Sequence, residues 1–419
     1  MNIKKILILF FLLSKNILYS QWIIQPTGVS SYLRDIDFIN SQTGWVCGDG
    51  GTILKTTNGG KNWISQVTGV TDKPLFSIHP VDSNVVYCVG WFETILKTTN
   101  GGNNWTIIEN APFGEGSSYE SCFFIDENTG WIGSTHNFLA KVRKTTDGGK
   151  SFENIILNSI LRDIYFINEL NGIGVGEVAF ISKTSNGGEN WSSYSIAGTG
   201  NLYRLSILND GMTGFVVSSR DILYKTTDFG ISWDSVGFIP NVISQLYSSS
   251  FSSDSLGWAG SISGVGIAQL FKTTNGGRNW TYQNQSNTRS YNDIFALNDS
   301  LVWTCGGFGT IFHTNTGGDT IVNISQISAT VPENFQLNQN YPNPFNSETK
   351  ISFRINKKDI YKLEIYDNLG RLIQKSFEEI INPGEYNYIL NINDLGTGIY
   401  FYTLSSTNNL QTKKMVIIK

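Results

Sequence analysis

Short segments in which apolar and polar residues alternate recur along the first three quarters of the chain. Two of them, residues 33–40 and 161–168, read LRDIDFIN and LRDIYFIN. Alternation over roughly 4 to 8 residues is typical of a half-buried β-strand. A second segment, TGWVCG, follows the first and recurs in related forms, and these copies lie at residues 43–48, 129–133, 213–217 and 256–260. The patterns predict an all-β fold built from short strands.

A turn motif of eight residues divides the same region into repeats. Its first copy reads TTNGGKNW at residues 56–63, and further copies follow at intervals of 42, 47, 39, 42, 47 and 41 residues, the last one degenerate. Asn or Asp at the third position accepts backbone hydrogen bonds, and Gly at the fifth position supplies a positive φ. Trp or Phe at the eighth position opens the next strand and buries its ring between repeats. In the first six copies these three positions are Asn58, Gly60, Trp63, Asn100, Gly102, Trp105, Asp147, Gly149, Phe152, Asn186, Gly188, Trp191, Asp228, Gly230, Trp233, Asn275, Gly277 and Trp280.

Each repeat contains four short strands in about 43 residues, which is the size of a β-propeller blade. Seven copies predict a seven-bladed β-propeller over residues 21–321. The segment QWIIQ at residues 21–25 resembles NWISQ at residues 62–66, the fourth strand of the first repeat. We therefore expect the segment around Trp22 to complete the last blade beside Ile311, because closure removes a free sheet edge. Residues 322–325 are the alternative source of this closing strand.

The repeats resemble the Asp-box, or bacterial neuraminidase, repeat, and the whole unit is similar to the photosystem II stability/assembly factor type of propeller. The resemblance covers roughly residues 22–321. It implies that the boxes are structural and lie on the face opposite the ligand site. Asp boxes also occur in sialidases and xyloglucanase-like glycosidases, so exo-acting hydrolysis of extracellular glycans is the alternative function. The Arg-Ile-Pro type motif of sialidases is absent, and xyloglucanase-like enzymes usually have two propellers.

A different pattern begins after residue 321. Residues 322–332 are rich in Ser, Asn and Thr and are predicted to be a linker, while residues 333–419 contain short strands separated by turn signals such as NLGR at 368–371. This spacing predicts a small antiparallel β-sandwich.

The final module resembles the type A sorting domain of the bacterial type IX secretion system. The residues that carry the resemblance include Asn340, Tyr341, Pro342, Asn343, Pro344, Phe345, Gly370, Lys413 and Lys414. The resemblance implies passage through the outer membrane with the type IX machinery as partner, and removal of this domain on export. A carbohydrate-binding or immunoglobulin-like module is the alternative interpretation.

Residues 1–20 fit a signal peptide. Lys4 and Lys5 precede an apolar run at residues 6–13, and Ser20 supplies a small residue before a cleavage point. The run is shorter than the roughly 20 residues that a membrane-spanning helix needs, and no later run is long enough. With the sorting motif, these features predict a protein that is secreted or attached to the outer surface of the outer membrane of a Gram-negative bacterium.

Composition narrows the functional classes further. A formal net charge of −4 provides no large basic surface, so we expect no nucleic-acid partner. Cys47, Cys88 and Cys305 fall at equivalent positions of separate repeats, too far apart for a disulfide, and we interpret them as small buried hydrophobic residues. The three histidines have no metal-ligand spacing, and we expect neither a metal nor a cofactor.

One constellation predicts a ligand-binding face. Arg34 and Arg162 occupy equivalent strand positions, and Arg204 lies one residue out of that register. The turn between the second and third strands carries an acidic residue in four repeats: Asp49, Glu93, Glu177 and Asp221. These turns share a propeller face with the starts of the inner strands, so a mixed acidic and basic rim there is a candidate site for a polar protein or glycan. Ordinary solvated turn charges are the interpretation that we favour for these residues.

Trp91 and Phe92, in the same loop as Glu93, are able to stack on sugars or to belong to the core. No catalytic constellation emerges from the sequence. We therefore predict a non-enzymatic binding or scaffold module.

Overall fold

A computed structural model of the chain describes residues 22–112, 116–136, 139–196, 200–240, 242–263, 268–283, 290–318, 324–328, 330–346, 348–391 and 395–418. The predicted signal peptide, residues 1–20, lies outside the described residues. The chain divides into two compact units, with the boundary between Thr320 and Ile321.

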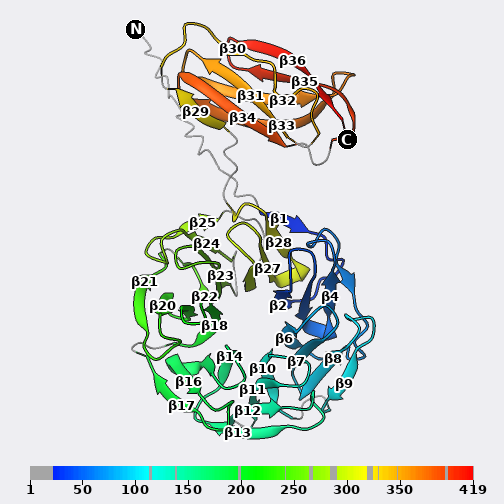
Figure 1. Ribbon diagram of the computed structural model, residues 1–419, viewed down its shortest axis with the longest axis vertical. Coiled ribbons are helices and arrows are strands. Elements are labelled where there is room, and N and C mark those ends of the chain that lie inside the picture. Colours follow the sequence, from blue (N-terminus) through cyan, green and yellow to red (C-terminus); the bar gives the residue numbers. More distant parts are fainter. Residues whose placement is uncertain are drawn as a thin grey trace, which may run out of the picture. The chain divides into compact units, whose positions relative to one another are not determined.

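Seven four-stranded antiparallel sheets are arranged radially in the N-terminal unit, which confirms the predicted seven-bladed propeller (Figure 1). Blades 1 to 3 consist of β2 (Leu33–Phe38), β3 (Gly44–Gly48), β4 (Ile53–Thr56) and β5 (Ile64–Ser65); β6 (Leu75–Pro80), β7 (Val86–Gly90), β8 (Thr94–Thr98) and β9 (Thr106–Glu109); and β10 (Ser118–Phe124), β11 (Gly130–His136), β12 (Leu139–Thr145) and β13 (Glu153–Leu157). Blades 4 and 5 consist of β14 (Leu161–Phe166), β15 (Gly172–Gly176), β16 (Phe180–Thr184) and β17 (Ser192–Ser195); and β18 (Leu202–Ile207), β19 (Gly214–Ser218), β20 (Ile222–Thr226) and β21 (Asp234–Phe238).

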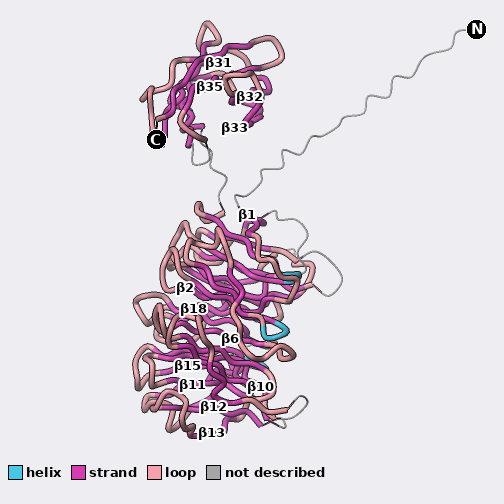
Figure 2. The backbone as a smooth tube through the Cα atoms, turned by 90° about the vertical axis from the view of Figure 1, so that its right-hand side faces the viewer, coloured by secondary structure: helices cyan, strands magenta, loops and turns pink. Residues whose placement is uncertain are grey.

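Blades 6 and 7 consist of β22 (Gln245–Phe251), β23 (Gly257–Ile262), β24 (Leu270–Thr273) and β25 (Thr281–Gln283); and β26 (Tyr291–Ala296), β27 (Val302–Gly306), β28 (Ile311–Thr314) and β1 (Ile23–Gln25). Three 3-10 turns, η1 (Asp49–Gly51), η2 (Glu177–Ala179) and η3 (Gly307–Gly309), connect second to third strands. Seen from the side in Figure 2, the strands lie inside the disc and the loops form its two faces.

The N-terminal strand closes the ring, as the sequence predicts. In β1, Ile24 pairs with Phe312 and Gln25 pairs with Ile311 of β28. The Trp22 ring is buried and its Nε1 donates a hydrogen bond to Gln283 Oε1 at 3.2 Å. The described part of the alternative closing segment, residues 324–325, belongs to β29 (Ile324–Ser328), which pairs in the C-terminal unit instead.

Each Asp box is a closed network of short hydrogen bonds. In the first copy, Thr56 Oγ1 accepts the backbone N–H of Gly60 at 2.8 Å, and Asn58 Oδ1 accepts that of Asn62 at 2.9 Å. The bond from the Gly N–H to the Thr hydroxyl is 2.8 or 2.9 Å in all seven copies. Gly60 has a φ of +88°, which other residues rarely adopt. The boxes therefore fix the hairpins between third and fourth strands.

Aromatic stacking joins neighbouring blades. The Phe38 ring of blade 1 stacks on Trp303 of blade 7, with centroids 4.0 Å apart. Trp131 and Phe166 stack in the same way at 3.5 Å between blades 3 and 4. All four cysteines are buried and free, which confirms the interpretation of Cys47, Cys88 and Cys305 as small buried residues and extends it to Cys122.

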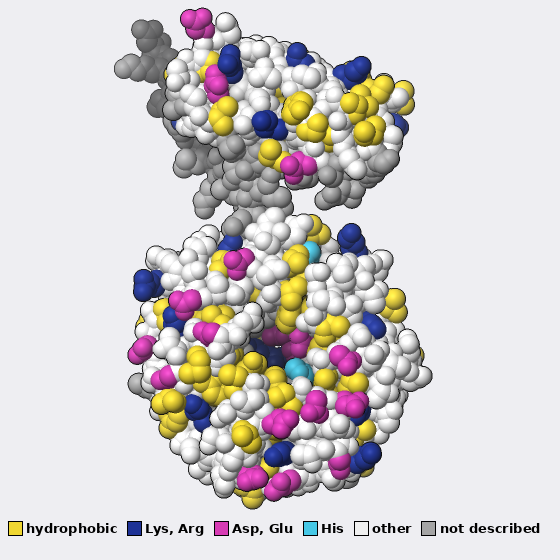
Figure 3. All heavy atoms as spheres, viewed as in Figure 1, with side chains coloured by type: hydrophobic (Ala, Val, Ile, Leu, Met, Phe, Trp, Pro, Cys, Tyr) yellow, Lys and Arg dark blue, Asp and Glu magenta, His cyan; other side chains and the backbone are white. Residues whose placement is uncertain are grey.

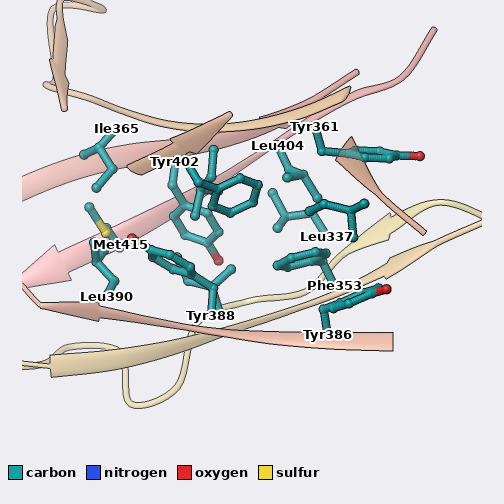
Figure 4. Packing of buried hydrophobic residues seen from close by; sticks show 14 of the residues in the cluster. Leu337, Phe353, Tyr361, Ile365, Tyr386, Tyr388, Leu390, Tyr402, Leu404 and Met415 are labelled. Atoms are coloured by element: carbon teal, nitrogen blue, oxygen red, sulfur yellow. The ribbon is translucent and has the colours of Figure 1, made fainter. Parts of the chain in front are cut away.

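The C-terminal unit is a sandwich of two four-stranded antiparallel sheets. One has the order β29-β34-β31-β30 and the other β33-β32-β35-β36. Their bounds are β30 (Gln336–Leu337), β31 (Glu348–Ile355), β32 (Asp359–Tyr366), β33 (Leu372–Ile381), β34 (Gly384–Asn391), β35 (Gly398–Ser405) and β36 (Leu410–Ile417). Figure 4 shows the core between the sheets, where Phe353 and Tyr388 face Tyr402 and Met415.

The position of β29 corrects the predicted linker of residues 322–332. This strand pairs with β34, with Ile324 opposite Tyr388. An edge strand is held by backbone hydrogen bonds, so a Ser-rich composition does not prevent pairing.

The sorting motif packs against the C-terminal strand. Asn340 is buried, and its Nδ2 donates to Pro342 O at 3.0 Å and Thr349 Oγ1 at 2.9 Å. Asn343 Oδ1 accepts the N–H of Val416 at 2.8 Å. Phe345 is buried, and its backbone N–H donates to the Val416 carbonyl at 3.1 Å. The Asn and Phe of the motif thus hold it onto β36.

Candidate ligand-binding site

Every inner strand of the propeller begins with a β-bulge. In blade 1, Leu33 pairs with Gly48 and Asp35 pairs with Cys47, so Arg34 is the extra residue that pairs with no residue of β3. A bulge re-aims the side chain of the extra residue, and here the seven extra side chains line one pocket of about 240 Å³. We call them the bulge ring, and its members are Arg34, Phe76, Glu120, Arg162, Tyr203, Tyr247 and Asn292.

Two arginines of the bulge ring form ion pairs. Arg34 Nε lies 2.5 Å from Asp49 Oδ1, and the Arg34 guanidinium lies 4.7 Å from the Phe76 ring centroid. Arg162 binds two carboxylates, with Nη1 at 2.8 Å from Glu120 Oε2 and Nη2 at 2.5 Å from Glu177 Oε1. The ion pairs hold both guanidinium groups in defined orientations at the mouth of the channel.

Arg204 lies deeper, because it is the residue after the bulge position in blade 5. Its Nη2 lies 3.2 Å from Asp35 Oδ1 and its Nε lies 3.2 Å from Asp293 Oδ1. The other oxygens of these carboxylates accept the backbone N–H groups of Ile78 at 2.8 Å and Ile36 at 3.1 Å. Burial raises the pKa of Asp293, and the charge of Arg204 opposes this shift. Arg204 therefore joins blades across the channel as well as lining the pocket.

Aromatic rings stand on two sides of the pocket. Phe76 meets Trp91 edge to face at a centroid distance of 5.6 Å, and Trp91 is 41% exposed. Tyr203 and Tyr247 of blades 5 and 6 pack at 4.4 Å. Rings and guanidinium groups together suit a ligand that has both apolar and polar groups.

The structure brings only part of the predicted rim together. Arg34, Arg162 and Arg204 line the pocket, and Asp49 and Glu177 bind the first two. Glu93 and Asp221 instead bond to the next blade. Glu93 Oε1 accepts from Ser117 Oγ at 3.2 Å, and Asp221 Oδ1 accepts from Leu246 N at 3.2 Å.

Sequence reasoning missed the other five members of the bulge ring. They are of four different residue types, so no single type marks the position in the sequence. Alignment of the seven repeats at the residue after a buried Leu or Tyr near the start of the inner strand is the signal that finds them, since Phe76 and Glu120 occupy the register of Arg34.

The Asp boxes lie at the other end of the blades. In blade 1, Leu33 pairs with Gly48 beside η1, whereas Phe38 pairs with Gly44, which in turn pairs with Thr56 of the box. In the part of the chain that the structure describes, no group of three or more potential ligands is placed to hold a metal ion. Over the same part of the chain, helices with the length and apolarity to cross a membrane are absent.

Comparisons with known proteins match both units. A model of the photosynthesis system II assembly factor YCF48 family matches residues 14–112 and 154–288, and a model of a secretion system C-terminal sorting domain matches residues 339–419. The photosystem II assembly lipoprotein Ycf48 of Synechococcus sp. (strain CC9902) is 22% identical over 166 residues, which span 39% of this chain and 49% of that relative.

Solved structures share the propeller fold. YCF48 bound to D1 peptide is 18% identical, with a TM-score of 0.58 over 71% of this chain and 98% of that chain. YCF48 from Cyanidioschyzon merolae is 16% identical, with a TM-score of 0.56 over 70% and 98%. The GH74 xyloglucanase from Xanthomonas campestris is 11% identical, with a TM-score of 0.56 over 81% and 60%.

Proposed function

Because the chain belongs to the photosynthesis system II assembly factor YCF48 family, we propose that its propeller is a non-enzymatic module that binds a peptide segment of a partner protein within the bulge ring. The observation that carries the proposal is that seven blades each direct one bulge residue into the same pocket. A related propeller has been solved with a D1 peptide, which supports a peptide as the class of ligand.

The C-terminal sorting domain indicates export through the type IX secretion system, to the cell surface or beyond. We propose that the predicted signal peptide serves the inner-membrane step and that the sorting domain is removed at the outer membrane, with release or surface attachment of the propeller. The partner is then an extracellular or surface protein and not a photosystem subunit.

The bonding of the rim carboxylates supports binding over hydrolysis. Retaining and inverting glycosidases use two carboxyl groups that flank the scissile bond. Asp49 and Glu177 are held by arginines, and Glu93 and Asp221 by groups of the next blade. Glu120 is likewise bound to Arg162.

A charge-matched pair of variants tests the proposed site. A peptide selected from a phage-displayed random library on the full chain serves as the probe, and calorimetry measures its affinity. The double variant Arg34→Gln/Arg162→Gln is expected to weaken binding at least about tenfold, since charge-assisted hydrogen bonds contribute about 1.5–3 kcal/mol each.

The control is Lys61→Gln/Lys150→Gln, which removes the same charge from exposed Asp-box positions on the opposite face. Equal loss in both double variants would contradict a site in the bulge ring. A panel of fluorogenic glycosides completes the test, because turnover that Glu120→Gln abolishes would establish the glycosidase alternative.

A further inference from the structure

The Asp-box end of the central channel holds a second cluster of side chains, which the proposed function does not use. The cluster consists of Asp37, His79, Phe123, Tyr165 and Phe295, each from the inner strand of a different blade, and we call it the lower ring. Its members line a channel cavity of about 280 Å³. They occupy equivalent positions, because each pairs with the second residue of the neighbouring strand, as Asp37 does with Trp45.

Two hydrogen-bond acceptors face each other in the lower ring. His79 Nε2 lies 2.9 Å from the carbonyl oxygen of Phe124, which only accepts, so Nε2 carries the proton. Burial lowers the pKa of His79 to about 4, so the imidazole is neutral at pH 7 and its Nδ1 is an acceptor. Nδ1 lies 3.6 Å from Asp37 Oδ2, too far for a direct hydrogen bond. A group with two N–H donors, placed in the cavity beside these two atoms, would satisfy both of them.

The charges of the channel favour a cationic donor. Among the described residues that line the cavity, four are aspartates, Asp35, Asp37, Asp163 and Asp293, and one is an arginine, Arg204. Burial raises the pKa of Asp37 well above its usual range, so a cation that binds beside this group favours its ionised form. Arg204 is engaged by Asp35 and Asp293. Asp37 lies nearer the Asp-box end, where its Oδ1 accepts the N–H of Phe38 at 2.7 Å and its Oδ2 faces His79.

Aromatic rings complete the surroundings of this pair. The Phe123 ring centroid lies 4.7 Å from that of His79 and 5.0 Å from that of Tyr165. Phe295 enters the cavity from blade 7. On the propeller face shown in Figure 3, the centre is hollowed, and acidic, basic and histidine side chains gather there beside hydrophobic ones. Aromatic faces attract organic cations and contact their alkyl groups.

We propose that the lower ring is a second binding site, which takes an organic ammonium ion such as a lysine side chain or a small alkylammonium. The ammonium nitrogen lies beside Asp37 Oδ2 and His79 Nδ1, within hydrogen-bond distance of both, and donates a hydrogen bond to each. The alkyl chain packs against Phe123, Tyr165 and Phe295. A hydrated inorganic cation gains nothing from these rings, so the site selects an alkylammonium.

The test is a titration of the full chain with n-butylammonium chloride, followed by calorimetry. Saturable binding is expected, and Asp37→Asn should weaken it at least tenfold while keeping the acceptor for Phe38 N–H. Asp234→Asn, which removes an exposed carboxylate from β21, is the matched control and should bind within twofold of the wild type.

Two control ligands are measured on the wild-type protein, so their results do not depend on whether the Asp37→Asn variant folds. In the wild type, n-butanol should not bind at the same concentrations, and ethylammonium should bind more weakly than n-butylammonium. Undiminished binding to Asp37→Asn would overturn the proposal. If sodium chloride displaced n-butylammonium at equal concentrations, the proposal would also be overturned. Such a result would mean that the aromatic rings do not contribute to binding.

Discussion

The three arginines that line the pocket differ in role because Arg204 lies one residue out of the register of Arg34 and Arg162. Arg34 and Arg162 are bulge residues with rim partners, whereas Arg204 follows the bulge and bonds to Asp35 and Asp293. Alignment of the repeats shows that Arg204 lies one residue beyond the position that Arg34 and Arg162 share. It does not reveal the buried partners, because Asp35 and Asp293 acquire their roles only when blades 1, 5 and 7 meet across the channel.

At the same scale, Asp163 makes stability depend on pH. Burial raises its pKa to about 6, against about 3.9 in an unfolded chain. Between these values the folded protein keeps a proton that the unfolded chain has lost, so the folded state loses stability as pH rises through this window. From pH 4 to pH 7, the unfolding free energy of the wild type should fall by about 2 kcal/mol relative to that of Asp163→Asn.

Urea unfolding at several pH values checks this expectation. Asparagine also forfeits one of the backbone bonds from Ile164 and Leu205, but that loss does not change with pH. A constant difference between the two proteins would show that Asp163 does not titrate in this range.

At the scale of the element, the Asp-box hairpins and most sandwich strands are predictable, whereas the bulges and β29 are not. A hairpin motif carries its turn chemistry in its own residues, as Thr56, Asn58 and Gly60 show. A bulge is a property of pairing between two strands, and β29 pairs through its backbone at a sheet edge. Neither leaves a pattern in the local sequence.

The Asp-box hydrogen bonds should contribute measurably to stability. Thr226 is buried, and its Oγ1 accepts the N–H of Gly230 at 2.8 Å and donates to Asp228 Oδ1 at 2.7 Å. Thr226→Val keeps the shape and leaves a buried N–H without an acceptor, so the unfolding free energy should fall by about 1–3 kcal/mol. Thr106→Val, at an exposed position of β9, should stay within about 0.5 kcal/mol of the wild type in the same thermal melts.

At the scale of the whole molecule, β1 links the beginning of the propeller to its end. The sequence predicts this closure because the segment at residues 21–25 looks like a fourth strand without its first three. Trp22→Ala removes a ring that is 7% exposed and its bond to Gln283, and it should lower the unfolding free energy by about 3–5 kcal/mol. Size-exclusion chromatography should also show larger species, since the edge of β28 becomes available for pairing.

Ile23→Ser is the control for this variant. Ile23 lies in the same strand but is 59% exposed, so stability and elution volume should match the wild type. Similar losses in both variants would mean that the strand tolerates no change at all, and closure would not depend on the Trp22 ring.

Export is a second property of the whole molecule, and we expect it to depend on the folded sorting domain. Phe345 is 3% exposed and holds the motif against β36. Phe345→Ala should lower the unfolding free energy of the sorting domain by about 3 kcal/mol. The variant protein should then remain in the periplasm. Cell fractionation with Leu410→Ser, at a position 68% exposed, provides the comparison. Normal export of Phe345→Ala would contradict the need for a docked motif.

The ring is sealed by β1, which precedes the repeats in the sequence and pairs with β28 of the last blade. A nascent or prematurely terminated chain that lacks β28 has nowhere to place β1, and both edges stay open to proteases and to other chains. A closed propeller therefore requires that translation has reached the seventh repeat. The sorting domain follows that repeat in the sequence, so a chain that carries the sorting domain also carries every strand that closure needs.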